Sequence, residues 1–219
     1  MYGDDNVDAQ AILKKLINRQ PSVMDQKFFK QYAVLLPLVE IEKEIHILFE
    51  VRSLKMRSQP GDVCFPGGRI DKEDANALAC AIRETTEELG ITPATIRHVF
   101  PLDYIVAPDG RVIYPYAGEI MSLEKMVLNK AEVAEVFTVP LTFFLEKEPD
   151  IYYVNLEVVP EANFPYHLIQ DGEDYDWRTR KVEELFYKYY DRVIWGLTAK
   201  IIKHFIEIIR AKKCIPNEG

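Results

Sequence analysis

The spacing of apolar residues divides the chain into helical and extended segments. Near the N-terminus, apolar residues recur every three or four positions over 8–19, and Asp8 stands where a helix cap belongs. This pattern predicts a short amphipathic helix that ends before Pro21. From Tyr32 to Arg52, two runs of aliphatic and β-branched residues flank a charged turn and show no helical face. Residues 32–52 are therefore predicted to form a β-hairpin.

The clearest helix is predicted over 71–89. Apolar residues recur along it at helical spacing, and Gly90 stands where a left-handed residue ends a helix. The stripe expected to face the core comprises Ala75, Leu78, Ala79, Ile82 and Leu89. The preceding residues, 53–68, are rich in Ser, Pro and Gly, so we expect a shaped loop there.

The second half of the chain alternates between extended segments and helices. Residues 98–120 predict strands separated by a Pro-Asp-Gly turn, and 133–145 predict a strand that runs into a short helix. Strand-like runs also occur within 146–190. A final amphipathic helix is expected over about 191–213, with Gly196 inside it at a cost of about 1 kcal/mol. These elements predict an α+β fold with a mixed sheet.

Composition and charge narrow the classes of function. The chain has 35 Asp and Glu against 27 Lys and Arg, a net charge of −8, which argues against a protein that mainly binds nucleic-acid phosphates. No segment has the length and apolar character of a membrane span, and the N-terminus resembles neither a secretory signal nor a transit peptide. We therefore expect a cytoplasmic protein with reduced cysteines and with no membrane or nucleic-acid partner.

Three carboxylates are predicted to share one face of the 71–89 helix. Glu84, Glu87 and Glu88 stand at positions i, i+3 and i+4, so their side chains are expected to converge. Carboxylate oxygens at this density suit Mg²⁺ or Mn²⁺. On an arbitrary helix the same residues would form a solvated acidic face. Here Arg83 can pair with Glu87, and a glycine-rich loop precedes the helix, which favours a metal site.

The loop before this helix carries the opposite charge. Between residues 52 and 69, four basic side chains occur with a single acid, Asp62. The basic residues are Arg52, Lys55, Arg57 and Arg69. A basic loop beside an acidic helix suits a diphosphate that is held by cations on one side and bridged through metal on the other. Taken singly, each of these charges is also compatible with an ordinary surface position.

The glycine-rich loop and the acidic helix together resemble the Nudix box, a glycine followed by REUxEExGU, in which U is a bulky aliphatic residue. The matching string is Gly68, a spacer, and Arg83-Glu84-Thr85-Thr86-Glu87-Glu88-Leu89-Gly90-Ile91. The spacer is one residue longer than in the common box, which leaves Ala75 where the register has a glutamate. We expect Asp74 or Glu73 to compensate. Thr85 also replaces an aliphatic residue.

A second string, upstream of the box, resembles the Nudix branch that acts on coenzyme A. Its residues fall at the spacings of RSxxxRxxxGxxxFPGG. They are Arg52-Ser53, Arg57, Gly61 and Phe65-Pro66-Gly67-Gly68. The longer spacer is a feature of the same branch. The strand end before this string reads Leu48-Phe49-Glu50-Val51-Arg52 where the branch has LLTxR, so the threonine is missing here.

The resemblance implies a fold and a reaction. The fold would be the Nudix α/β/α sandwich, with a mixed sheet between helices. A helical extension would occupy 1–30, and the hydrolase domain would occupy 31–219 and include the C-terminal helix. The implied reaction is hydrolysis of the diphosphate of coenzyme A or acyl-CoA, with Mg²⁺ or Mn²⁺, to 3′,5′-ADP and (acyl-)4′-phosphopantetheine.

The resemblance also implies roles for individual residues. The metal site is assigned to Gly68, Glu84, Glu87 and Glu88. The catalytic set comprises the same three glutamates with Arg83, and with Glu132 and Glu135 as candidates for an additional ligand or general base. The substrate-binding set comprises Arg52, Lys55, Arg57, Gly67, Gly68 and Arg69. The expected partner is a small nucleotide similar to coenzyme A.

Two other functions stay open on the sequence. A Nudix hydrolase for ADP-ribose or another nucleoside diphosphate derivative would share the box and differ in the upstream string. A Nudix-like regulator would bind a nucleotide without hydrolysing it, although the three glutamates of the box argue against lost catalysis. Residues 146–190 could shape the pocket or form a homodimer contact, and the sequence does not decide between these roles.

Overall fold

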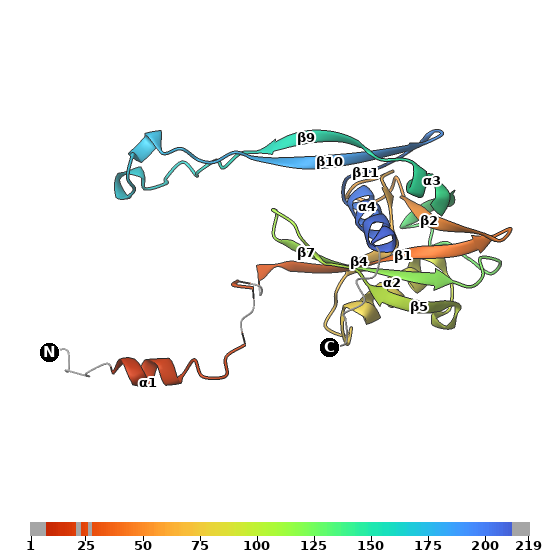
Figure 1. Ribbon diagram of the computed structural model, residues 1–219, viewed down its shortest axis with the longest axis horizontal. Coiled ribbons are helices and arrows are strands. Elements are labelled where there is room, and N and C mark those ends of the chain that lie inside the picture. The colour runs from red at the N-terminus through yellow and green to blue at the C-terminus, as the bar shows by residue number, and fades with distance from the viewer. Residues whose placement is uncertain (1–7, 21–22, 26–27, 212–219) are drawn as a thin grey trace, which may run out of the picture.

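A mixed β-sheet with helices on both faces forms the body of the protein (Figure 1). The computed structural model describes residues 8–20, 23–25 and 28–211. The strands of the main sheet are β1 (Lys30–Ile41), β2 (Glu44–Arg52), β3 (Val63–Cys64), β4 (Gly67–Arg69), β5 (Ile96–Pro101), β6 (Ile105–Val106), β7 (Arg111–Ile120) and β8 (Val133–Pro140). Their order along the principal path is β3-β2-β1-β7-β5, and β4, β6 and β8 pair with β1, β7 and β2 respectively.

The predicted hairpin and the predicted mixed sheet are both confirmed. β1 and β2 pair antiparallel, with Leu38 opposite Ile47. Glu42 and Lys43 connect them with φ angles of 51° and 70°, the two left-handed residues that a tight hairpin turn requires. β1 pairs parallel with β7 on its other side, which makes the sheet mixed.

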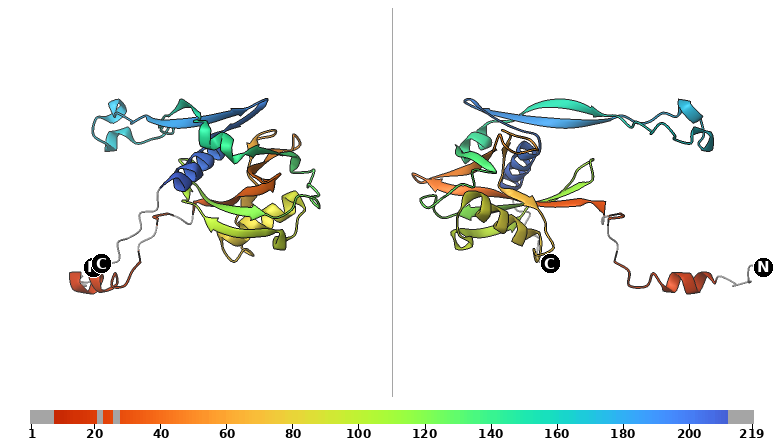
Figure 2. Two further views of the ribbon diagram at one scale, coloured as in Figure 1. Left: turned by 45° about the vertical axis from the view of Figure 1, so that its right-hand side comes forward. Right: turned by 180° about the vertical axis from the view of Figure 1, so that it is seen from behind.

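Helices cover the two faces of the main sheet, as the α/β/α prediction requires (Figure 2). Helix α2 (Ala77–Leu89) lies on one face, where Cys80 and Ala81 pack with Ala33 of β1. Helices α3 (Leu141–Glu146) and α4 (Gly196–Arg210) lie on the other face. The sheet therefore separates two apolar layers, and the α2 side also carries the candidate site.

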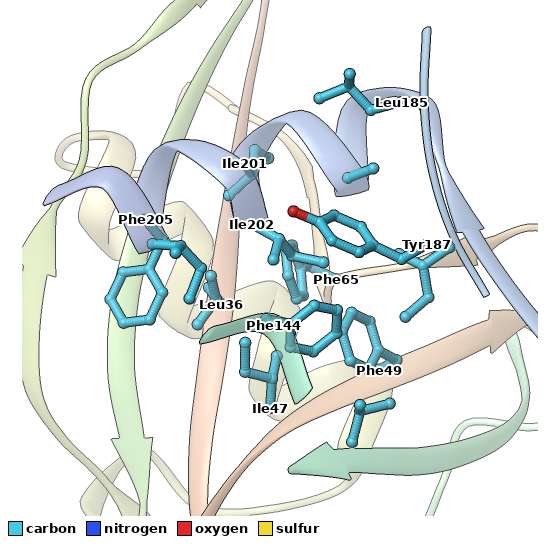
Figure 3. Close-up of a cluster of buried hydrophobic side chains, with 14 of the residues drawn as sticks. Leu36, Ile47, Phe49, Phe65, Phe144, Leu185, Tyr187, Ile201, Ile202 and Phe205 are labelled. Carbon is cyan, nitrogen blue, oxygen red and sulfur yellow. The ribbon is translucent and has the colours of Figure 1, made fainter. Parts of the chain in front are cut away.

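The larger apolar layer lies between the sheet and α4 (Figure 3). Phe49 of β2 is at its centre, with its ring stacked on those of Phe65 and Phe137 at centroid distances of 5.3 Å. Because side chains alternate along a strand, the preceding residue, Leu48, points to the α2 side and packs with Leu89. The same alternation directs the residue after Phe49 to the α2 side.

A second, three-stranded sheet covers the outer side of α4 (Figure 1). It consists of β9 (Asp150–Leu156), β10 (Arg180–Tyr189) and β11 (Arg192–Trp195), in the order β11-β10-β9. Leu185, Tyr187 and Ile194 join the core from this sheet. The strand-like runs within 146–190 are thus confirmed, and the structure shows what they cover.

The predicted start and buried stripe of the 71–89 helix are wrong. α2 begins at Ala77, because the Asn76 side chain accepts a hydrogen bond from the Ala79 N–H at 2.9 Å and caps the helix there. The residues of α2 that are buried are Cys80, Ala81, Thr85, Glu88 and Leu89. Of the expected stripe, only Leu89 is among them, because two polar residues face inward. The predicted left-handed end at Gly90 is confirmed, with φ 63°.

The terminal helices are shorter than predicted. α1 spans Ala9–Lys14, and its predicted cap is confirmed, because Asp8 accepts a hydrogen bond from the Gln10 N–H. Pro21 and Lys213 lie outside the described residues. α4 begins at Gly196 because the residues before it form β11. Gly196 has φ 59° at the helix start, so the expected cost of a glycine inside the helix does not arise.

Candidate active site

Four glutamates from three parts of the chain gather beside α2, and we call them the acidic centre. They are Glu50 near the end of β2, Glu84 and Glu88 on α2, and Glu132 just before β8. Burial raises the pKa of Glu88 to about 8, with further increases from the charges of Glu84 and Glu132. Burial is thus the main cause of this increase, and the charges of the neighbouring glutamates add to it.

Glu50 belongs to the acidic centre because of its position on β2. It follows Phe49, which faces α4, so its side chain points to the α2 side. Only 2% of the residue is exposed, and among the described residues no hydrogen-bond partner reaches its Oε1. Burial, and then the charge of Glu88, raise the pKa of Glu50 well above its ordinary value. In the sequence, Glu50 stands out only as a departure from LLTxR.

Two glycines of β4 bring the loop and α2 into contact. The Gly67 N–H donates a hydrogen bond of 2.8 Å to Glu88 Oε2. At Gly68, an added Cβ would lie 2.3 Å from the Glu84 carboxyl carbon, so this carboxylate lies directly against the backbone of β4. The predicted site residues Gly67, Gly68, Glu84 and Glu88 are thus neighbours.

Arg83 is held by carboxylates on several sides. Its Nε and Nη2 each bind Asp74 at 2.9 Å, and its Nη1 lies 2.9 Å from Glu84 Oε1 and 3.2 Å from Glu87 Oε2. The predicted pair with Glu87 is therefore present. The bonds from Arg83 hold the pKa of Asp74 far below its ordinary value. Of the two acids expected to compensate for the missing glutamate, Asp74 is the one that binds Arg83, whereas Glu73 is exposed.

The structure does not bring Glu87 into the acidic centre. Its side chain is 57% exposed, whereas that of Glu84 is 15% exposed. The expectation that three adjacent carboxylates converge on one patch is therefore met by Glu84 and Glu88 but not by Glu87. The reason is geometric, because residues at i and i+3 on a helix differ by about 60° in direction.

Of the two downstream glutamates, the structure places Glu132 and not Glu135 at this site. Glu132 accepts a hydrogen bond from Asn129 Nδ2 at 3.2 Å and raises the pKa of three glutamates of the centre. Glu135 stands opposite Val51 in the ladder, on the α4 side of the sheet. There it forms an ion pair with Arg192, which lowers the pKa of Glu135.

The basic loop is anchored at Arg52. The Arg52 N–H donates to Asp62 O, and the Gly61 N–H donates to Arg52 O, which closes the loop between them. Burial raises the pKa values of Glu50 and Glu88, and the positive charge of Arg52 partly opposes that increase. Arg52 therefore lies where the loop meets the acidic centre.

The other three predicted cations are on the surface. Lys55, Arg57 and Arg69 are exposed, and within the described parts of the chain none of them has a carboxylate at salt-bridge distance. Side chains without protein partners are free to bind phosphate oxygens. The structure brings one of the four predicted basic residues directly to the acidic centre and places the others on the loop and strand around it.

The chemistry of the donor set fits a hard divalent cation. Among the described residues, the structure places no three Asp, Glu, His or Cys side chains close enough to one another to bind a single metal ion. The fit rests on two other observations: the buried, unpartnered Oε1 of Glu50, and the Glu84 carboxylate against the Gly68 backbone. All donors are carboxylate oxygens, which Mg²⁺ and Mn²⁺ prefer.

With EDTA present, we expect the free energy of unfolding to fall as the pH rises from about 4.5 to about 8. Glu88 has a pKa of about 8 in the folded protein and an ordinary value of 4.5. Unfolded chains therefore lose this proton first, so its stabilising contribution is complete below pH 4.5 and is lost as the pH approaches 8. Thermal unfolding at several pH values measures this slope. A melting temperature that rises steadily over this range would contradict the prediction, and Glu88→Gln should flatten the slope.

The fold and the acidic centre define a class of protein. A basic loop and a glutamate-bearing helix meet at a pair of glycines, beside a mixed sheet that lies between helices. The family model described as NUDIX domain matches residues 30–190. The chain belongs to the Nudix family and is a Nudix hydrolase, and such enzymes generally use divalent metal ions.

Two relatives are similar to this protein over most of the chain. Peroxisomal coenzyme A diphosphatase NUDT7 of Mus musculus is 36% identical over 165 residues, which cover 74% of this chain and 67% of that protein. The uncharacterized Nudix hydrolase NudL of Enterobacter sp. (strain 638) is 32% identical over 174 residues, 80% of each protein. A solved structure, the NUDIX domain of Shewanella oneidensis NrtR with ADP ribose, has a TM-score of 0.45 at 18% identity and covers 61% of this chain and 86% of that chain.

Proposed function

We propose that this enzyme hydrolyses the diphosphate linkage of coenzyme A or an acyl-CoA to 3′,5′-ADP and (acyl-)4′-phosphopantetheine, with Mg²⁺ or Mn²⁺. The observation that carries the proposal is the contact between the loop and α2, in which the Gly67 N–H donates a hydrogen bond of 2.8 Å to Glu88 Oε2. It joins a phosphate-binding loop to a metal-binding centre, and a diphosphate requires both. The similarity to a coenzyme A diphosphatase supports the choice of substrate.

The proposed mechanism divides the work between the two sides of the site. Glu84, Glu88 and Glu132 would hold the metal, with Gly68 beside them. When bound, the metal lowers the pKa of the attacking water and spreads the charge of the leaving phosphate. Glu132 is our candidate to accept the proton of that water. Arg83 is a positioning residue, because its contacts orient the glutamates of α2.

The remaining predicted residues act on the substrate or support it in this proposal. Arg52, Lys55, Arg57 and Arg69 would bind the phosphate groups of the nucleotide. Gly67 and Gly68 allow β4 to lie directly against the glutamates. Glu87 is exposed and would contribute from the rim of the site.

Arg57→Ala is expected to raise the KM for coenzyme A about tenfold and to leave the melting temperature unchanged. The side chain is exposed, so its loss removes phosphate contacts without removing buried contacts, and a charge-assisted hydrogen bond contributes about 1.5–3 kcal/mol. Steady-state kinetics with saturating Mg²⁺ measure the effect. Arg97→Ala, an exposed arginine on β5, is the control, and an unchanged KM in Arg57→Ala would remove Arg57 from the substrate site.

The substrate is tested by separating the products after incubation with coenzyme A, ADP-ribose or nucleoside triphosphates. We expect 3′,5′-ADP from coenzyme A in the presence of Mg²⁺ or Mn²⁺, and intact coenzyme A when EDTA replaces the metal. Hydrolysis of ADP-ribose alone would assign the enzyme to another Nudix substrate class. Binding of coenzyme A without products under all metal conditions would favour a regulator.

The proposed partner is one small nucleotide, and neither a nucleic acid nor a membrane is predicted. Within the described helices, none combines the length and the hydropathy of a bilayer span. The cytoplasmic location, the homodimer and the division of the chain at residue 30 stay predictions.

A further inference from the structure

Glu50 is buried, where a charged carboxylate lowers stability unless a cation or a hydrogen-bond donor binds it. The residue is 2% exposed, and a buried charge is stable only when it is paired or coordinates a metal. In the ladders of the main sheet it stands opposite Cys64 and Val136. Among the described residues, neither these neighbours nor any other group gives its Oε1 a hydrogen bond.

Arg52 does not satisfy this carboxylate. Its Nε donates to Ser58 O at 3.3 Å, and within the described chain no ion pair joins it to Glu50. Arg52 contributes a favourable charge at a distance, while Glu88 and Glu132 contribute unfavourable ones. The protein surroundings of Glu50 therefore contain more negative than positive charge.

The sequence also departs from the resembling motif at this position. The strand end resembles LLTxR except that Glu50 stands in place of the threonine. A threonine is smaller and uncharged, so it would fit beside Cys64 without the cost of burying a carboxylate. A glutamate at this position instead places a carboxylate on β2, on the face of the sheet that α2 covers.

We propose that Glu50 is an additional ligand of the divalent metal site, contributed by β2 and not by the Nudix helix. The proposal rests on the proposed function, because it concerns the same site. Hard cations bind six or more oxygens, and glutamates of a single helix approach an ion from one side only. With Glu50 and Glu132, the acidic centre has carboxylates from β2, from α2 and from the residue just before β8.

Binding of Mn²⁺ to the full chain without substrate tests this role. We expect calorimetry to show that Glu50→Gln and Glu50→Thr each weaken Mn²⁺ binding at least tenfold. Glu50→Gln keeps the size of the side chain, and Glu50→Thr restores the residue of the resembling motif. Glu40→Gln, an exposed glutamate on β1, is the matched control and should bind Mn²⁺ as the wild type does.

A second readout separates a ligand from a structural residue. With EDTA present, both Glu50 variants are expected to melt at a higher temperature than the wild type, because they remove a buried, repelled carboxylate. Saturating Mn²⁺ should raise the melting temperature of the wild type more than that of either variant. Wild-type Mn²⁺ affinity in both variants, or destabilisation in EDTA with an unchanged response to Mn²⁺, would overturn the proposal.

The two proposals can fail separately. If the wild type binds Mn²⁺ through Glu50 but leaves coenzyme A intact, the ligand assignment stands and the substrate assignment fails. If the wild type hydrolyses coenzyme A and the Glu50 variants bind Mn²⁺ normally, the ligand assignment fails and the substrate assignment stands.

Discussion

Glu88→Gln is expected to lower the turnover of coenzyme A by about 10²- to 10³-fold while the protein stays folded. Metal ligation in such sites contributes several kcal/mol to the transition state, and each 1.36 kcal/mol is about a factor of ten in rate. The amide oxygen of glutamine can still accept the hydrogen bond that the Gly67 N–H gives to Glu88. The change therefore removes a charge and keeps the contact between β4 and α2.

The measurement is turnover at saturating substrate and Mg²⁺, together with the melting temperature in EDTA. Glu73→Gln provides the control, because Glu73 is an exposed glutamate of the segment before α2. Its activity should match that of the wild type. If Glu88→Gln keeps more than about a tenth of wild-type turnover, the buried carboxylate is not part of the catalytic machinery, and the metal site must be placed elsewhere.

Gly67→Ala is expected to destabilise the protein by about 3 kcal/mol. Gly67 has φ 152°, a backbone conformation that residues with a side chain rarely adopt. Its added Cβ would lie 2.4 Å from Ala33 O and 2.7 Å from Val34 Cα, which are backbone atoms of the central strand β1. Strain and overpacking therefore act together, and each costs about 1–3 kcal/mol.

Denaturant unfolding measures this loss, with Gly172→Ala as the control. Gly172 also has a positive φ, 54°, but its added Cβ would meet only Tyr166 O, at 3.9 Å. That substitution should cost about 1 kcal/mol, because it carries the conformational strain without the clash. Equal losses in the two variants would show that the approach of β4 to β1 does not limit stability.

Elements that depend on local sequence were predicted well. The hairpin of β1 and β2 follows from two aliphatic runs and a charged turn, and the left-handed Gly90 follows from the end of an apolar repeat. The start of α2 was misplaced because the helical pattern continues upstream of Asn76, whereas the cap decides where the helix begins. The stripe was misplaced because it counted apolar residues only, and Thr85 and Glu88 face inward.

The residues of the site also fall into two groups, those that the local sequence predicts and those that depend on how the strands pair. Gly68, Glu84 and Glu88 belong to one local motif, so their proximity follows from a loop and the helix after it. The approach of Glu50 and Glu132 depends on how β2 and β8 pair, which no local pattern specifies. Glu135 lies on β8 and Glu132 just before it, so the direction of each side chain also depends on where that strand begins.

The choice between Asp74 and Glu73 required the structure. Both acids lie within the longer spacer, near the expected register. The Asp74 carboxylate accepts two hydrogen bonds from Arg83. It also accepts a hydrogen bond from the backbone N–H of Asp71, three residues earlier in the chain. The turn before α2 therefore selects the residue, and the selection depends on backbone geometry that composition does not reveal.

The small sheet gives the protein an uneven resistance to local opening. From Asp150 to Glu184 no residue is buried, whereas Leu185 and Tyr187 on the same hairpin are anchored in the core. Amide protons in the outer hairpin should therefore exchange with solvent through small fluctuations, while those of β1 should require opening of the whole sheet. Local opening of the outer hairpin can therefore occur without disturbing the acidic centre, which lies on the other side of the main sheet.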